Sequence, residues 1–380
     1  MADPVLSKPE LSQPESSTPA LSARGLSTPA VVTPVISRIE PIFSPRPWGA
    51  RSLAPLFPEK TNLSEPLGEA WLTGFDCKVV NGPYANRTLK ESWRAMPAEW
   101  RGTQLKKCPD FPVLIKFIFP QDKLSIQVHP DDAYASVHEI AAGGRGKTEM
   151  WHIVSAQPEG AILLGLKAGV SKELFEKAIR ENQVEGLLEK YLVKAGESYF
   201  VPARTQHAVL PGMTICEVQE YSDLTYRVYD YGRLDAAGKP RELHLQKALE
   251  VTNFGQSLAG KVPPLALHSP DANKHLLAAC DFFATERWDC CKTTFVESDP
   301  EHFQVLVILE GSGTFHDTDV SFDFHAGETW FLPATLPVMM LQPKTTASLL
   351  RVFVPQIPAL RRELLRQGFD ESALSHVLFG

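Results

Sequence analysis

The feature that most constrains the fold is a pattern that occurs twice in the chain, with the copies 131 residues apart. The first copy is Gly196-Glu-Ser-Tyr-Phe-Val-Pro-Ala-Arg-Thr-Gln-His207, and the second is Gly327-Glu-Thr-Trp-Phe-Leu-Pro-Ala-Thr-Leu-Pro-Val338. Each copy has Gly, five residues, Pro and four more residues before its final position. A turn followed by a buried strand fits this pattern, and its recurrence predicts two similar β units. The alternative is that two common turn-and-strand segments match by chance.

Two β units imply a division of the chain into domains. The 380 residues are enough for two of them. Residues 1–38 are rich in Ser and Pro and contain no aromatic residue, so we predict a disordered tail that buries too little apolar surface to fold. We predict a first domain over residues 39–255 and a second over residues 256–380. Because Val338 replaces His207 in the second copy, only the first domain is expected to bind a metal.

A few helices interrupt the β-rich pattern. Apolar residues at three- and four-residue steps predict a short helical insert over about residues 171–192, with Ser171 as its N-cap. Residues 151–155 and 160–165 are predicted to pair as a hairpin. Further helical segments are predicted over residues 240–251, 358–366 and 371–378. The expected fold class is therefore mainly β, with a few helices.

Four residues of types that bind metals lie in predicted β segments of the first domain. Gln127 and His129 are two residues apart in Leu124-Ser-Ile-Gln-Val-His-Pro-Asp131, so on a strand their side chains point to the same face. Glu149 and His207 complete a set with O, N, O and N donors. Such a set suits one divalent metal, zinc first, with manganese, cobalt or iron as alternatives. The alternative interpretation is that the histidines are hydrogen-bonded structural residues.

Composition and charge exclude several classes of partner. The formal net charge is −7 and no nucleic-acid-binding motif is present, so we expect no nucleic-acid partner. No apolar run approaches the roughly 18 residues of a membrane span, and the N-terminus lacks the pattern of a secretory signal. The six cysteines are scattered and form no Cys-x-x-Cys pair, as is typical of a reducing cytoplasm. We expect a cytoplasmic protein, of unknown oligomeric state, that acts on a small molecule.

Four motifs together resemble one enzyme family. They are Leu-Ile-Lys-Phe (114–117), Leu-Ser-Ile-Gln-Val-His-Pro-Asp-Asp (124–132), Lys-Thr-Glu-Met-Trp (147–151) and Val-Pro-Ala-Arg-Thr-Gln-His-Ala (201–208). From about Arg46 to about Pro355 the chain resembles the type I phosphomannose isomerases. The resemblance implies a double cupin fold, with two β-barrel or jelly-roll domains, the first of them catalytic. It also implies one divalent metal and interconversion of mannose 6-phosphate and fructose 6-phosphate through a cis-enediolate.

The same resemblance implies roles for residues beside the expected metal site. Arg227 matches the arginine of the family's Ser-Asp-x-x-x-Arg element, so it is expected to stabilise charge on the reacting sugar or to bind its phosphate. Glu217 stands at the family's carboxylate position and is the candidate acid–base group. Lys147 is expected to transfer protons or to bind substrate. Ser125 and Lys116 are expected to bind substrate.

Alternatives to these roles stay open from the residues alone. Arg227 could form only an ion pair with Asp223 or Asp230, in which case Arg233 is a second candidate for its role. Glu217 could be an ordinary surface residue.

Two positions depart from the family's pattern. Arg204 stands where the motif usually has Gly, so it is expected to narrow the pocket or to contact the phosphate. Gly146 stands where some relatives have His. The alternative functions are an isomerase of a different sugar phosphate and a non-catalytic cupin that binds a sugar or a metal.

Overall fold

Three β-sheets form most of the structure, a computed structural model that describes residues 33–234, 238–317 and 320–380. The mainly β fold expected from the sequence is confirmed. The predicted tail over residues 1–38 lies almost entirely outside the described residues, whereas residues 34–380 form one compact unit.

Residues 42–262 supply all strands of two of the sheets, in both of which all neighbouring strands are antiparallel. A seven-stranded sheet has the order β14-β10-β7-β12-β5-β3-β2, and a five-stranded sheet has the order β13-β6-β11-β8-β9. The strands of the seven-stranded sheet are β2 (Ile42–Ala50), β3 (Leu67–Trp71), β5 (Val113–Ile118), β7 (Glu149–Ala156), β10 (Ser198–Val201), β12 (Met213–Glu220) and β14 (Gly260–Val262). Those of the five-stranded sheet are β6 (Ile126–Val128), β8 (Ala161–Leu166), β9 (Leu188–Leu192), β11 (His207–Val209) and β13 (Tyr226–Tyr229).

The eleven-stranded sheet is built mostly from the second half of the chain. Its main path is β15-β16-β17-β22-β19-β21-β1-β4, and β18, β20 and β23 pair beside it. Its strands are β1 (Ser37–Glu40), β4 (Lys78–Val79), β15 (Leu265–Leu267), β16 (Asn273–Cys280), β17 (Ala284–Cys290), β18 (Thr294–Val296), β19 (Gln304–His316), β20 (Ser321–His325), β21 (Thr329–Leu332), β22 (Met339–Phe353) and β23 (Leu378–Phe379).

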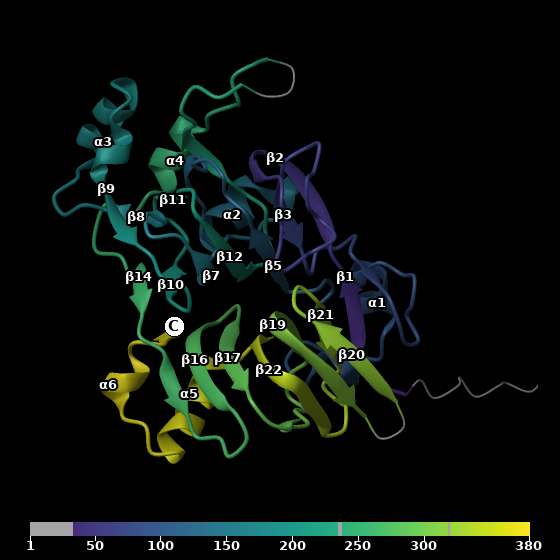
Figure 1. Cartoon of the computed structure of the whole chain (residues 1–380). Coiled ribbons are helices and arrows are strands. Elements are labelled where there is room, and N and C mark those ends of the chain that lie inside the picture. Colours follow the sequence, from purple (N-terminus) through teal and green to yellow (C-terminus); the bar gives the residue numbers. More distant parts are fainter. Residues whose placement is uncertain (1–32, 235–237, 318–319) are drawn as a thin grey trace, which may run out of the picture. The chain divides into compact units, whose positions relative to one another are not determined.

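Strand pairing crosses the predicted domain division in both directions. Strand β1, near the start of the described chain, lies beside β21, with Ser37 opposite Phe331 (Figure 1). Strand β14, which follows residue 255, pairs instead with β10 of the seven-stranded sheet. The boundary at residue 255 stays a prediction.

The layering of the sheets follows from the alternation of side chains along their strands. In β5, Val113, Ile115 and Phe117 pack in a core shared with the eleven-stranded sheet. Ile118 packs on the opposite face, in a core shared with the five-stranded sheet. The seven-stranded sheet is therefore buried on both faces, which explains why β5 is apolar along its length except at Lys116.

Helices cover the other face of the five-stranded sheet. Phe175 of α3 and Ala248 and Val251 of α4 pack against strands β6, β8 and β11 (Figure 1). The α-helices are α1 (Leu89–Ala95), α2 (Asp132–His138), α3 (Lys172–Arg180), α4 (Leu245–Val251), α5 (Ile357–Arg366) and α6 (Glu371–Leu374), and the 3₁₀ helices are η1 (Ala98–Arg101), η2 (Ile140–Ala142) and η3 (Val184–Leu187). No helix in the described ranges is long and apolar enough to cross a membrane.

The helical insert is shorter than predicted. Helix α3 begins after its N-cap Ser171, as expected, but ends at Arg180, and residues 188–192 form strand β9. Asn182 has a φ of 56°, a left-handed conformation that ends the helix. Leu188 and Leu192 fit helical spacing, but pairing with β8 satisfies their backbone instead.

The predicted hairpin of residues 151–155 and 160–165 is wrong. Strand β7 pairs with β10 and β12 in the seven-stranded sheet, whereas β8 pairs with β9 and β11 in the five-stranded sheet. The short connection between them carries the chain from one layer to the next. Both segments are buried apolar runs, and nothing in such a run indicates which strands it will pair with.

The three sheets are not closed into barrels, in contrast to the simplest form of the expected fold. Strands β19 and β22 are long and pair along most of their length, with register shifts between Ile308 and Glu310 and between Gly311 and Gly313. Such β-bulges increase twist and let a strand bend. These long strands can therefore bend, although the two edges of the sheet are not joined by hydrogen bonds into a closed barrel.

The two copies of the sequence repeat adopt the same local structure. Gly196 and Gly327 have φ values of 86° and 87°, and the strands β10 and β21 begin two residues after them. At Gly327 a Cβ atom would lie 2.4 Å from the carbonyl oxygen of Leu56, so the turn requires glycine for space as well as conformation.

The aromatic contact between the two halves of the chain gives a test of the packing. Phe303, which is 1% exposed, packs against Trp93 and Phe111 of the first half with ring centroids 5.4 Å and 5.2 Å apart. We expect Phe303→Ala to lower the free energy of unfolding by about 3–5 kcal/mol. Phe295→Ala is the control, because Phe295 is exposed, and it should cost less than about 1 kcal/mol. Urea unfolding monitored by tryptophan fluorescence distinguishes them, and equal effects would contradict this packing.

Candidate functional site

Three predicted metal ligands converge at one end of the space between the seven-stranded and five-stranded sheets. His129 follows β6 and His207 begins β11, both in the five-stranded sheet, whereas Glu149 begins β7 of the seven-stranded sheet. All three are buried, and their potential ligand atoms lie within 4.8 Å of one another. No other group of three or more such residues occurs within the described ranges. Gln127 of β6 pairs directly with His207, and its Nε2 lies 3.3 Å from His207 Nε2.

Backbone carbonyl groups orient both histidines. Nδ1 of His129 donates to the carbonyl oxygen of Leu224 at 2.6 Å, and Nδ1 of His207 donates to that of Thr205 at 2.9 Å. With the ring proton on Nδ1, both Nε2 atoms present lone pairs to the cluster. Burial, reinforced by the charge of Lys147, holds the pKa of His129 well below its usual range and lowers that of His207 to about 4. Both rings are therefore neutral at physiological pH.

The cluster fits a divalent cation. The Nε2 atoms of His129 and His207 lie 3.7 Å and 3.5 Å from the two oxygens of Glu149. Glu149 Oε1 is buried and has no hydrogen-bond partner among the described residues. A buried acceptor without a partner is costly, and a metal ion would satisfy it together with both Nε2 lone pairs.

Lys147 joins the expected ligands to the candidate acid–base group. Its Nζ forms an ion pair with Glu149 Oε2 and lies 3.2 Å from Nε2 of His129 and 3.8 Å from Oε1 of Glu217. It precedes β7 rather than lying in the strand. A Cβ at the preceding Gly146 would lie 2.7 Å from the carbonyl carbon of Asp131, which explains why no side chain stands there.

Glu217 is buried at the centre of the seven-stranded sheet and is not a surface residue. On β12 it lies opposite Lys116 of β5 and Trp151 of β7. The indole Nε1 of Trp151 donates to Glu217 Oε1 at 3.1 Å. Burial raises the pKa of Glu217, and the nearby Lys147 only partly offsets this effect. A buried carboxyl group with a raised pKa beside a cavity is typical of an acid–base group.

A cavity of about 430 Å³ opens next to this cluster. Ser125 and Lys116, the predicted substrate-binding residues, both contribute to its wall, as does Arg227. The lining residues are Arg46, Trp48, Glu69, Lys116, Ile118, Leu124, Ser125, Gln127, Lys147, Trp151, Val209, Glu217, Asp223, Thr225, Arg227 and Arg241. Polar and charged groups therefore surround one space beside the expected metal ligands.

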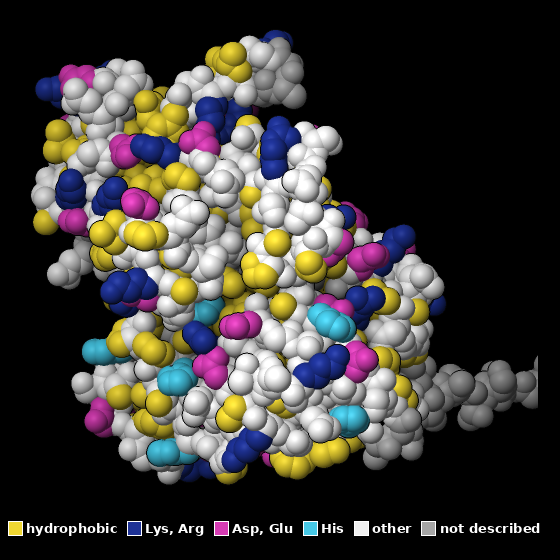
Figure 2. Space-filling view, viewed as in Figure 1, with side chains coloured by type: hydrophobic (Ala, Val, Ile, Leu, Met, Phe, Trp, Pro, Cys, Tyr) yellow, Lys and Arg dark blue, Asp and Glu magenta, His cyan; other side chains and the backbone are white. Residues whose placement is uncertain are grey.

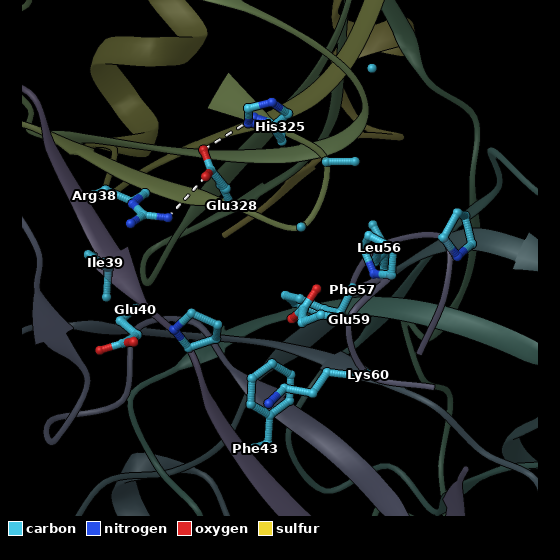
Figure 3. A pocket seen from close by; sticks show the side chains of 16 residues that line it. Arg38, Ile39, Glu40, Phe43, Leu56, Phe57, Glu59, Lys60, His325 and Glu328 are labelled. Carbon is cyan, nitrogen blue, oxygen red and sulfur yellow. Dashed lines mark hydrogen bonds and ion pairs between the residues drawn. The ribbon is translucent and has the colours of Figure 1, made fainter. Parts of the chain in front are cut away.

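A larger hollow, of about 690 Å³, lies elsewhere in the molecule and lacks this chemistry. Figure 3 shows its labelled side chains, including Arg38, Phe43 and Lys60, with Arg38 paired to Glu328 at 3.0 Å. Its wall contains none of the three clustered residues His129, Glu149 and His207. We place the functional site in the smaller cavity, because chemistry rather than volume decides the choice.

Lys116 keeps its charge inside the protein. Its Nζ contacts Asp223 Oδ1 at 3.0 Å and lies 4.4 Å from the centroid of the Trp71 ring. Burial alone would lower its pKa, but Glu69, Asp223 and Glu217 together raise the pKa above its ordinary value. The lysine therefore ends in a polar pocket rather than reaching the surface.

Arg227 makes no ion pair with any residue in the described part of the chain. Asp223 pairs with Lys116, and Asp230 pairs with Arg233 and Arg241. Arg227 Nη1 donates to the carbonyl oxygen of Glu242 at 2.9 Å, while its buried Nε has no partner among those residues. The ion-pair alternative for Arg227 is thus not what the structure contains, and Arg233 is committed to Asp230.

Sequence reasoning missed several residues of the cavity wall. Arg46 forms an ion pair of 2.7 Å with Glu69, and Arg241 binds the buried Asp230. The two-residue spacing of Glu69 and Trp71 on a strand is a signal that could have placed Glu69 on the same face as the ring that contacts Lys116. Nothing in the sequence indicates that Arg241, far from the motifs, returns to this cavity.

Arg204 does not narrow the cavity or face it, in contrast to the expectation. It is absent from the lining residues, and its Nε donates to the carbonyl oxygen of Val251 at 2.9 Å. The turn between β10 and β11 directs the side chain toward the end of α4.

Charges of both signs are mixed on the surface. On the face shown in Figure 2, Lys and Arg side chains are interspersed with Asp and Glu rather than gathered in one basic area. The cavity is lined by five cationic residues, Arg46, Lys116, Lys147, Arg227 and Arg241, and by the acidic Glu69, Glu217 and Asp223.

Comparison with known proteins finds one family. The family model for phosphomannose isomerase type I, catalytic domain, matches residues 36–150. Mannose-6-phosphate isomerase ManA of Bacillus subtilis (strain 168) is 33% identical over 310 residues, which cover 80% of this chain and 94% of ManA. The crystal structure of the mannose 6-phosphate isomerase from Bacillus subtilis has a TM-score of 0.77 and 31% identity, and the match covers 83% of this chain and 99% of that one.

A more distant solved structure shares the fold. A mannose 6-phosphate isomerase bound with zinc and yttrium matches with a TM-score of 0.66 and 16% identity, over 84% of this chain and 100% of that one. These likenesses confirm the expected fold class.

A pair of acidic residues, the buried Glu220 and the exposed Asp132, contacts the loop that carries Lys147. Asp132 Oδ1 accepts a hydrogen bond from the backbone N–H of Gly146 at 2.7 Å, and Glu220 lies against Asp132. Burial, with the proximity of Asp132, raises the pKa of Glu220 from 4.5 to about 9. Glu220 is therefore protonated at neutral pH in the folded protein but ionised in the unfolded chain.

This acid pair makes stability depend on pH. Between pH 4.5 and about 9 the folded state binds one more proton at Glu220 than the unfolded state, so stability falls as pH rises. We expect wild type to lose about 1.4 kcal/mol of unfolding free energy per pH unit relative to Glu220→Gln. Urea unfolding at pH 5.5 and pH 8 measures the difference. The exposed Glu310→Gln serves as control, and the same pH slope in wild type and Glu220→Gln would refute this protonation state.

Proposed function

The chain belongs to the type I phosphomannose isomerases, and on that premise we propose that it interconverts mannose 6-phosphate and fructose 6-phosphate. The observation that carries the proposal is the meeting of His129, Glu149 and His207 beside the buried carboxyl group of Glu217. A protein that only stored a metal would not need a buried acid–base group and several cations in the same cavity.

Gln127, His129, Glu149 and His207 would together hold one divalent metal. We favour zinc, because the set offers oxygen and nitrogen donors and a solved isomerase of the same fold carries zinc. When bound, such a cation polarises the sugar carbonyl and favours a cis arrangement of the two reacting oxygens. The positive charge of Lys147 already compensates the negative charge of Glu149. A bound cation would compete for the same carboxylate, so the ion pair between Lys147 and Glu149 would have to weaken.

Glu217 is our candidate for moving the proton between C1 and C2. Isomerisation of an aldose to a ketose needs one group that removes a proton from one carbon and returns it to the next. Glu217 lines the cavity, and Trp151 fixes one of its oxygens at 3.1 Å. Lys147, 3.8 Å away, is placed to donate to a sugar oxygen while the proton moves.

Arg227, Lys116 and Ser125 are our candidates for binding the substrate. Arg227 has no carboxylate partner in the described residues, so its guanidinium is free to bind the phosphate or to stabilise charge on the reacting sugar. Lys116 stays charged beside Asp223, and Ser125 adds a buried hydroxyl group to the wall. We also propose a cytoplasmic location, since all six cysteines are free.

Removal of the metal should abolish the reaction. In a coupled assay for mannose 6-phosphate isomerisation, we expect a chelator to remove activity and added zinc, manganese or cobalt to restore it. His129→Ala should lose activity by more than about 100-fold, because it removes one ligand. The exposed His138→Ala should behave as wild type. Full activity after exhaustive chelation would refute the role of a metal, and metal binding without any turnover of sugar phosphate would favour a binding cupin.

The acid–base role of Glu217 has a matched control within the chain. Glu286 is also buried and accepts a hydrogen bond from a tryptophan, Trp288, at 2.7 Å, but lies in the second half. We expect Glu217→Gln to lower kcat by about 100- to 10,000-fold with little change in metal content. Glu286→Gln should leave kcat unchanged. Steady-state kinetics with metal analysis decides, and a near-normal kcat in Glu217→Gln would transfer the role to Lys147.

A further inference from the structure

Arg204 occupies an unusual backbone conformation between two parts of the proposed metal site. It lies in the turn that joins β10 to β11 and has a φ of 71°. Residues other than glycine rarely adopt this left-handed region, because their Cβ crowds the following carbonyl group. Such a conformation persists only where surrounding contacts fix it.

The backbone of Arg204 joins two segments that are far apart in sequence. Its N–H donates to the carbonyl oxygen of His129 at 2.7 Å, and its own carbonyl oxygen accepts from the N–H of Asn253 at 2.9 Å. His207, three residues later, begins β11 directly after this turn. Arg204 therefore contacts the backbone of one expected ligand, His129, and lies in the turn that leads directly to the other, His207.

The side chain of Arg204 strengthens the same connection. Its Nε donates to the carbonyl oxygen of Val251, the last residue of α4, at 2.9 Å. Its Nη1 lies 3.4 Å from Oδ2 of Asp131, two residues after His129. Asp131 Oδ1 accepts from the N–H of Tyr134 at 2.9 Å and so caps α2. The guanidinium thus ties the chain after His129 to the end of α4.

We propose that Arg204 is a positioning residue that fixes His129 relative to His207 and thereby raises the affinity of the site for its divalent cation. The inference rests on the proposed metal ligands. Arg204 does not line the cavity, so it acts through these contacts and not through the substrate. A glycine at this position would adopt the same φ without strain but would lose the contacts to Val251 and Asp131.

Arg204→Gly therefore isolates the contribution of the side chain. We expect its zinc dissociation constant, measured by competition with a chromophoric chelator, to rise by about 10- to 100-fold, as is typical when a residue that orients a ligand is lost. Isomerase activity should then require correspondingly more zinc. Asn182→Gly is the matched control, since Asn182 also has a positive φ, of 56°, at the end of α3 and away from the ligands, and its zinc affinity should equal that of wild type.

A second variant tests the same inference if Arg204→Gly does not fold. Asp131→Asn keeps a residue that caps α2 well but removes the negative charge facing Arg204. We expect its zinc dissociation constant to rise several-fold, with α2 retained by circular dichroism. Wild-type zinc affinity in folded Arg204→Gly, or in Asp131→Asn if the former does not fold, would overturn the inference.

These outcomes are distinct from a failure of the proposed function. A wild-type protein that binds zinc through His129 but does not isomerise mannose 6-phosphate would refute the function while leaving the effect of Arg204 on affinity intact. A wild-type protein from which His129→Ala removes no zinc binding would instead overturn the site and this inference together.

Discussion

The buried carboxylate of Glu149 is the group on which the construction of the site depends. An ionised carboxylate away from water is costly unless charges and donors compensate it. Here Lys147 supplies the charge, and two neutral imidazoles face the carboxylate from the opposite sheet. This arrangement requires two sheets to meet with their inner faces in register, because no single strand carries all of these groups.

The sandwich supplies that register through ordinary apolar packing. Along the inner face of the seven-stranded sheet, Ile118, Ile153 and Ile215 form a core with the five-stranded sheet. Toward one end of the same face, charged residues replace the apolar ones, at Lys116 and Glu217. The packed apolar residues of each strand thus fix the position of the charged residues on the same strand. Few further contacts are needed to position the site.

Local patterns in the sequence were enough to predict part of this structure. The repeat led to β10 and β21, and the two-residue spacing of Gln127 and His129 led to a shared face beside Glu149 and His207. Both signals depend on the alternation of side chains along a strand, which any short segment reveals.

The remaining features depend on which strands pair, and short segments do not reveal that. Lys116 lies opposite Glu217 only because β5 and β12 are neighbours in one particular register. The separation of β7 and β8 into different sheets and the return of Arg241 to the cavity are of the same kind. The end of α3 at Arg180 was missed because four-residue spacing of leucines suits both a helix and the strand that follows.

The pairing of β1 with β21 has a consequence for how the protein is made. Ser37 leaves the ribosome long before its partner Phe331, which is 294 residues later in the chain. Until then β1 can pair with β4, but its edge that faces β21 has no native partner. Closing so long a loop is slow and entropically unfavourable. The eleven-stranded sheet therefore cannot be completed before β21 has been synthesised, and the nascent chain must keep the free edge of β1 from pairing elsewhere until then.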